Sequence, residues 1–432
     1  MDIRVKEINS FTREMGIAAP WEELQESFHG SVDRFRHKIK LQGFRKGKVP
    51  KKILLQQFGP EIEADFAQEA VERLYIEALR EKSFVPVNRA EIDELDFTQG
   101  QPLTFTATFE IEPAVTLPKY KRKMKVSKNV YQPDKQDVDD FIEELRRQSA
   151  QLETNETGSV EGSLLLIDMQ ELDSTGVPII GRKVEERYIK VGDGVFGGEN
   201  LSRLTDLKAG DTAVLDVPSQ DGNASTRYEL TVRNVQEEIM PDVDEDFIRQ
   251  VDGEAETEEV FRSNILDRIQ KRLDHDSEAQ FEDAIIAYFL REVDPEVPPA
   301  MVDGYVENSL EDARNKNGET VDEEQYRTEV RPSVIRNLKW YLIRKELIKS
   351  EEISISDEQV DERVDEIVTT AGKESGPIQR FYRKKTNRER LREDLMDREL
   401  FDKLKSYAKV KEVKIETKEL RRQRSLAQDD PA

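Results

Sequence analysis

The spacing of apolar residues changes along the chain, and each pattern predicts a different secondary structure. Between residues 103 and 111 apolar and polar residues alternate, which is typical of a half-buried strand. Residues 160–240 hold short runs rich in β-forming residues, separated by Gly, Pro and Asp. From Pro241 onward apolar residues recur at spacings of three and four, as on one face of a helix. A chain of 432 residues with these patterns is expected to be a multidomain α+β protein.

The same patterns divide the chain into four segments of different predicted structure. The first is α+β, the second a linker with a strand and a helix, the third mostly β and the fourth all-α. They cover residues 1–112, 113–158, 159–241 and 242–432. In the first segment, a short strand near Ile3 and Val5 is expected to pair with the strand at 103–111. The end of the last, RRQRSLAQDDPA, is expected to be a disordered tail.

Composition excludes several classes of function. The chain has no cysteine, so it has no disulfide, no thiolate metal site and no cysteine nucleophile. It has no P-loop, and its three histidines are too scattered for a metal site, so neither nucleotide nor any cofactor or metal is expected. No apolar run approaches the length that spans a membrane, and the start lacks an apolar leader. We therefore expect a cytoplasmic protein without a membrane partner.

The net charge of −24 disfavours an anionic partner, except where cations gather locally. Residues 34–52, RFRHKIKLQGFRKGKVPKK, contain nine Lys or Arg and no acid. An apolar stripe precedes and enters this window at helical spacing: Trp21, Leu24, Phe28, Val32, Phe35 and Ile39. The window therefore begins on a helix that carries its cations outward. A second acid-free basic stretch, KYKRKMKVSK at 119–128, is expected to be an extended linker before a helix from about Asp134 to Leu152.

The middle of the basic window predicts a tight loop between two helices. Gly43 is expected to end the first helix, because glycine readily adopts positive φ. Pro50 precedes a new apolar periodicity that starts at Ile53. The loop would expose Phe44 among cations that are able to contact phosphates. A basic run is most often a solvated face, but a chain of charge −24 gains no solubility from an acid-free basic block.

GFRKGKVP (43–50) resembles the ribosome-docking signature of the trigger factor family, the bacterial chaperones at the nascent-chain exit. The resemblance implies a docking site made of Gly43, Phe44, Arg45, Lys46, Gly47, Lys48 and Pro50. It implies contacts of Phe44, Arg45 and Lys46 with a ribosomal protein and ribosomal RNA of the large subunit. It also implies nascent and unfolded polypeptides as clients, helical arms around an open cradle, and a homodimer when the protein is free.

In that family the middle segment resembles prolyl isomerases of the FK506-binding-protein type, which use an aromatic-lined pocket and neither acid, base nor metal. By this resemblance the pocket positions fall on Met169, Ile179, Phe196 and Tyr228. Only Tyr228 keeps an aromatic where the family pattern expects one, the floor of the pocket falls near Phe196 in the stretch FGGEN, and the loop PSQDGNAS is short and lacks a tyrosine. The pocket is thus degenerate, and we expect weak or absent isomerase activity and no confident catalytic residue.

Three functions remain in order of preference. The first is an ATP-independent, ribosome-associated chaperone that shelters new polypeptides. The second is a peptidyl-prolyl isomerase whose altered pocket still acts on X–Pro bonds, and the third is an RNA-binding module unrelated to the ribosome. The acid excess surpasses what any of them requires, and adaptation to a salt-rich cytoplasm is one interpretation of it.

Overall fold

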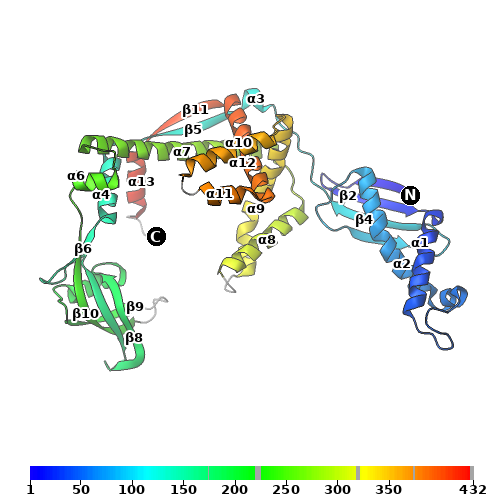
Figure 1. Ribbon diagram of the computed structural model, residues 1–432, viewed down its shortest axis with the longest axis horizontal. Helices are drawn as coiled ribbons and strands as arrows, with labels where there is room; N and C mark the ends of the chain where they lie inside the picture. Colours follow the sequence, from blue (N-terminus) through cyan, green and yellow to red (C-terminus); the bar gives the residue numbers. More distant parts are fainter. Residues whose placement is uncertain (174, 219–224, 318–321, 373–374, 429–432) are drawn as a thin grey trace. The chain divides into compact units, whose positions relative to one another are not determined.

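The computed structural model describes residues 1–432 except 174, 219–224, 318–321, 373–374 and 429–432. The chain forms two compact units, each built from two stretches of sequence. The first comprises Met1–Lys128 with Gln280–Lys411, and the second comprises Asn129–Ala279 with Glu412–Ala432. Helical and β-rich regions alternate along the chain (Figure 1), as expected for a multidomain α+β protein. None of the helices within the described ranges is both long and apolar enough to cross a membrane.

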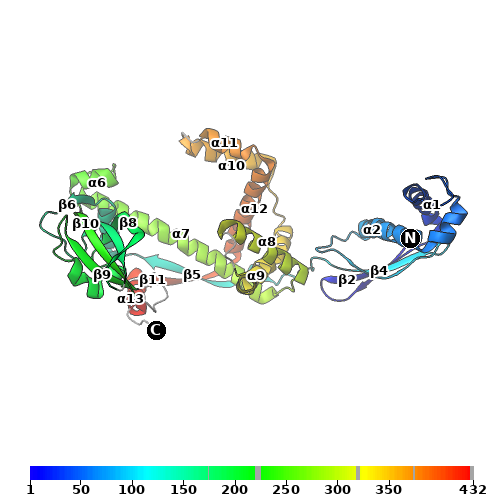
Figure 2. The ribbon, with the colours of Figure 1, turned by 90° about the horizontal axis from the view of Figure 1, so that it is seen from below.

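The N-terminal part of the first unit is a four-stranded antiparallel sheet with helices packed on one face (Figure 2). Its elements are β1 (Asp2–Glu7), β2 (Thr12–Ala19), α1 (Trp21–Lys38), α2 (Lys51–Lys82), β3 (Glu91–Asp96) and β4 (Leu103–Glu110). The strand order is β1-β2-β4-β3. Alternate residues of β2 and β4 are buried against α1 and α2, which confirms the half-buried strand predicted at 103–111.

The expected pairing of the first strand with β4 is wrong. Ile3 lies opposite Ile17 of β2, and β2 in turn pairs with β4 along its whole length. The sequence of β2, TREMGIAA, buries only Met15, Ile17 and Ala19 together with the stem of Arg13, and it contains a glycine. Every second residue of β2 is buried, but one of these is Arg13 and the less buried positions between them include Gly16 and Ala18, so the residue types do not mark it as a central strand.

The helical part of the first unit consists of long helices that pack around several separate small cores. Its helices are the end of α7 (Glu258–Val293), then α8 (Pro299–Asn317), α9 (Glu323–Ser350), α10 (Asp357–Thr370), α11 (Ser375–Tyr382) and α12 (Lys385–Tyr407). The apolar periodicity that runs from Phe261 to Phe289 forms one continuous helix, α7, rather than a broken pair. Ser356 caps α10 through a capping box with Gln359, as its position in the sequence predicts.

The second unit contains a five-stranded antiparallel sheet. Its strands are β6 (Gln151–Thr154), β7 (Leu164–Leu172), β8 (Pro178–Lys190), β9 (Thr212–Pro218) and β10 (Ser225–Ile239). β10 pairs with β7 on one side and with β9 and β6 on the other. Between β8 and β9, short turns (Gly194–Phe196 and Gly198–Asn200) lead into α5 (Leu201–Leu204). The β-rich prediction for 160–240 is therefore confirmed.

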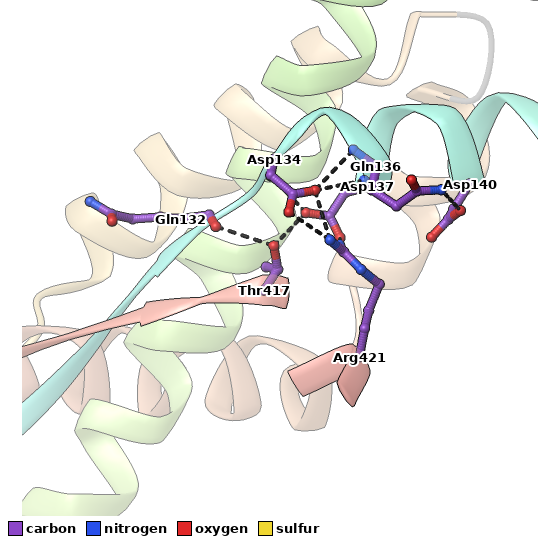
Figure 3. Close-up of polar contacts among 7 residues, drawn as sticks. All are labelled: Gln132, Asp134, Gln136, Asp137, Asp140, Thr417 and Arg421. Carbon is purple, nitrogen blue, oxygen red and sulfur yellow. Dashed lines mark hydrogen bonds and ion pairs between the residues drawn. The ribbon is translucent and has the colours of Figure 1, made fainter. Parts of the chain in front are cut away.

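The all-helical prediction for the end of the chain is wrong after α12. β11 (Lys409–Glu416) pairs with β5 (Lys125–Gln132), and α13 (Thr417–Gln428) follows it. Its Arg421 forms ion pairs with Asp134 and Asp137 at the start of α4 (Lys135–Gln148), and the hydroxyl of Thr417 donates to the carbonyl of Gln132 (Figure 3). These contacts explain why residues 421–428 of the expected tail are helical. Residues 429–432 lie outside the described ranges.

Candidate functional site

The basic loop between α1 and α2 begins earlier than the sequence predicts. α1 ends at Lys38, where Ile39 is its C-cap, so Gly43 does not end the helix. Gly43 and Gly47 both adopt positive φ, at 89° and 78°. The amide of Phe44 donates to the carbonyl of Leu41 at 3.2 Å, and that of Lys48 donates to the carbonyl of Arg45 at 2.9 Å. The loop is thus two successive tight turns, each with a glycine at a position that other residues rarely adopt.

Two residues near the end of the loop attach it to the core of the N-terminal part. Val49 is 1% exposed and belongs to the same hydrophobic cluster as the buried faces of α1 and α2. Gly47 is buried against the ring of His37 on α1. Pro50 then precedes the first residue of α2. Since the second half of the loop is packed and both of its turns are closed by backbone hydrogen bonds, its tip has a defined backbone rather than a free one.

The tip itself presents one aromatic ring surrounded by cations. Phe44 is 39% exposed, and Arg45, Lys46 and Lys48 are exposed. Within the part of the chain that the structure describes, these three cations form no ion pair. In contrast, the neighbouring Lys51 pairs with Asp33 at 2.8 Å and holds the pKa of that carboxyl below its usual value. The loop cations are therefore available to an external anion.

Three of the four pocket positions of the middle domain lie at one core cluster of its sheet. Met169 on β7 is 6% exposed and faces Leu230 of β10 across the strand pair. Phe196 and Tyr228 are partly buried against the same cluster, whereas Ile179 on β8 is not part of it. The segment 159–241 contains one further aromatic residue, Tyr188 on β8, which is half exposed. Residues 219–224 of the loop PSQDGNAS lie outside the described ranges.

The glycine-rich stretch GDGVFG (192–197) lies in the short turns after β8. A dinucleotide-binding loop requires a strand followed directly by a helix of several turns. Here only α5, four residues long, follows the turns. Among the described residues no group of three or more His, Asp or Glu is arranged to hold a metal ion.

A buried carboxylate was missed by the sequence reasoning. The side chain of Glu351, which directly follows α9, accepts hydrogen bonds from the hydroxyls of Tyr120 and Tyr407 and pairs with Lys121. Burial raises the pKa of Glu351 and these donors lower it, with a net shift below the usual value. The sequence carries no signal for this site, because its members lie more than 50 residues apart from one another except for Tyr120 and Lys121.

Comparisons with known proteins agree along nearly the whole chain. The family described as "Bacterial trigger factor protein (TF)" matches residues 1–145, and its C-terminal counterpart matches residues 257–406. The trigger factor of Marinobacter nauticus is 25% identical over 428 residues, covering 97% of this chain and 98% of that protein. That of Geobacter sulfurreducens is 24% identical, covering 88% of this chain and 92% of that protein.

A solved structure of the trigger factor chaperone, described for promiscuous substrate recognition in folding and assembly, has a similar fold. Its TM-score is 0.56 at 19% identity, with 94% of this chain and all of that chain covered. The family matches lie on both sides of the β-rich domain and include the loop at 43–50. This chain belongs to the trigger factor family, whose members are ribosome-associated chaperones.

Proposed function

We propose that this chain binds the large ribosomal subunit next to the nascent-chain exit through the loop Gly43–Pro50. The proposal rests on the contrast between buried and exposed residues within the loop. Gly47 and Val49 are buried and hold the backbone, whereas Phe44, Arg45 and Lys46 project outward without an internal partner among the described residues. The exposed side chains of the tip add no packing or ion pair to their own domain, so a binding partner best explains them.

The chemistry of the tip suits a partner made of both protein and RNA. Arg45, Lys46 and Lys48 are able to contact phosphates without reading base sequence. Phe44 is able to stack on a base or to fill an apolar crevice of a ribosomal protein. A mixed surface of this kind occurs where a ribosomal protein lies beside ribosomal RNA.

Co-sedimentation with ribosomes tests the proposal. The variant Phe44/Arg45/Lys46→Ala is expected to remain in the supernatant while the wild-type chain pellets with large subunits. A matched control is Phe381/Arg383/Lys384→Ala, which removes the same kinds of exposed side chain at the junction of α11 and α12. If the loop variant pellets like wild type, or if both variants lose binding equally, the loop is not the docking site.

The client-sheltering surface is proposed to include exposed apolar side chains of the helical part. Tyr305 on α8 and Phe381 on α11 are both 53% exposed, while Met301 is partly buried against a small core. Exposed apolar groups of this size bind unfolded segments weakly and release them as they fold, so no nucleotide is needed. Tyr305/Phe381→Ser is expected to suppress aggregation of an unfolded client less than wild type does. The control Val85/Leu95→Ser, which also removes exposed apolar groups, is expected to behave like wild type.

Two further parts of the proposal follow from family membership, and a third follows from the residues of the middle domain. The chain acts in the cytoplasm, since that is where ribosomes synthesise protein. When free of ribosomes it forms a homodimer, which light scattering at rising concentration would detect as a doubling of mass.

The middle domain acts as a spacer or a binding surface rather than as an efficient isomerase, because its pocket positions hold few aromatic rings.

A further inference from the structure

The second basic stretch, 119–128, is not the extended linker that the sequence predicts. Residues Tyr120–Lys123 form a helical turn, α3, before β5 begins at Lys125. Tyr120 is 4% exposed and Met124 is fully buried, and both belong to a hydrophobic core formed with α7, α9 and α12. The ring of Tyr120 packs edge-on against Phe289 at 5.4 Å. The backbone of this cationic turn is therefore held firmly in place by apolar packing.

One of the cations in the turn has a structural role. The ammonium of Lys121 lies 3.0 Å from the buried carboxylate of Glu351 and 5.3 Å from the ring centre of Tyr407. Tyr407 donates to the same carboxylate at 3.0 Å, and Lys403 donates to the backbone carbonyl of Glu351 at 3.1 Å. Burial, together with the hydrogen bond to Glu351, raises the pKa of Tyr120 to about 12. Because these groups satisfy Glu351, its negative charge is already matched.

The remaining cations of the turn have no such partner. Lys119, Arg122 and Lys123 are exposed, and none forms an ion pair with any residue in the described ranges. They surround a hollow of about 500 Å³ lined by residues 117–123 and Ser350. Leu117 and Pro118 give this hollow an apolar wall. A fixed turn thus combines three unpaired positive charges with a surface able to accept a flat apolar group.

Solubility does not explain this cluster. The chain has 91 acidic residues against 67 basic ones, so carboxylates that would neutralise the turn are abundant. Like charges held close together on a rigid turn repel one another, which costs stability unless an anion binds. The absence of a neutralising carboxylate among the described residues is therefore better explained by an external anion than by a solvated face.

We propose that the turn Lys119–Lys123, with the hollow beside it, binds the sugar–phosphate backbone of single-stranded or looped RNA. Lys119, Arg122 and Lys123 contact phosphates, and a base or ribose packs against Leu117 and Pro118. Every nucleotide of RNA offers a phosphate together with a flat base, whereas an acidic polypeptide offers a ring only where an aromatic residue lies beside its carboxylates. This surface is distinct from the loop Gly43–Pro50 and does not depend on its role.

Fluorescence anisotropy of a labelled single-stranded RNA, titrated with the full chain, tests the proposal. All proteins carry Phe44/Arg45/Lys46/Lys48→Ala, so that the tip of the loop does not contribute. Adding Lys119/Arg122/Lys123→Gln is expected to abolish most of the remaining RNA binding. Each phosphate contact contributes about −0.7 to the slope of log K against log salt for single strands, so losing three contacts reduces the steepness by about 2.

The matched control is Arg89/Lys208/Lys271→Gln, which removes three exposed and scattered cations and changes the net charge equally. It is expected to bind RNA with the affinity and salt slope of its parent. Thermal melting checks that all variants fold alike. The proposal is overturned if the turn variant binds RNA like its parent, or if the scattered control loses as much affinity. It is also overturned if polyglutamate displaces the RNA as effectively as unlabelled RNA does, since the surface would then accept any polyanion.

Discussion

The backbone of Gly47 lies directly against the imidazole of His37, so that a β-carbon at residue 47 would stand 2.7 Å from Nδ1. Residue 47 also has a φ of 78°, which costs a non-glycine residue about 1–2 kcal/mol. Gly47→Ala is therefore expected to distort the loop and to weaken ribosome binding about five- to thirtyfold. Equilibrium binding to purified large subunits measures this loss.

Gly43→Ala is the control for that effect. Its φ of 89° is equally unfavourable, but no atom lies within 4 Å of the added β-carbon. Its loss of affinity should be smaller, and His37→Ala should restore part of the binding of Gly47→Ala by removing the clash. If Gly47→Ala binds like wild type, the packed loop backbone does not matter for docking.

The aromatic and cationic parts of the loop are expected to differ in their response to salt. Arg45/Lys46→Gln should weaken ribosome binding strongly at low salt and little at high salt, because phosphate contacts are lost to counterions as salt rises. Phe44→Ala should weaken binding by a similar factor at every salt concentration, since apolar burial is not screened. Binding curves for both variants over a salt series would separate the two contributions. Parallel salt dependence of the two variants would contradict this division.

The ion pair between Asp168 and Arg233 is expected to make the middle sheet sensitive to acid. The guanidinium lies 2.8 Å from the carboxylate, and together with Lys183 and the amide of Glu186 it lowers the pKa of Asp168 to about 2. Because the folded pKa lies below the unfolded value of 3.8, the pair stabilises the sheet above about pH 4. This contribution is lost as the pH falls from about 4 to about 2.

Asp168→Asn should accordingly destabilise β7 and β10 by about 1–3 kcal/mol at neutral pH and by much less near pH 2. Amide hydrogen exchange in those two strands of the full chain measures the difference. Asp216→Asn on β9 is the control, because the Asp216 side chain is 38% exposed and its ion pairs with Arg203 and Arg227 contribute little. A difference for Asp168→Asn that does not shrink with falling pH would refute the assignment.

The middle domain is expected to show weak or no catalysis of X–Pro isomerisation. Such catalysis needs an apolar pocket of aromatic rings around the proline, and here Met169 is part of the core while Ile179 lies outside it. A peptide assay with an X–Pro substrate should give rates near the uncatalysed exchange, which takes tens of seconds or longer. Robust catalysis that is lost in Tyr228→Ala or Phe196→Ala would show that the altered pocket still works.

Local patterns predicted most elements, because they depend on contacts between residues that are near in sequence. The stripe from Trp21 to Phe35 forms α1, Ser356 caps α10, and alternation marks β4. The errors concern which strands pair and where the helical pattern of the C-terminal part ends. The first strand pairs with its neighbour β2 rather than with β4, and β11, which is almost fully exposed, is a strand only because the distant β5 pairs with it.

Some features of the candidate sites could likewise be predicted from the sequence, and others could not. The sequence by itself determined the acid-free basic loop, the exposed Phe44 within it, and the scarcity of aromatic residues in the middle domain, because composition and spacing are local properties. Only the tertiary structure decided that Gly47 and Val49 anchor that loop, that Arg421 holds the C-terminal helix to α4, and that Tyr120 fixes a cationic turn beside Glu351. Burial of apolar surface places Val49 and Tyr120, and the pairing of β11 with β5 places Arg421. These associations are made in the folded chain, and neither segment of a pair carries a periodic pattern that indicates its partner.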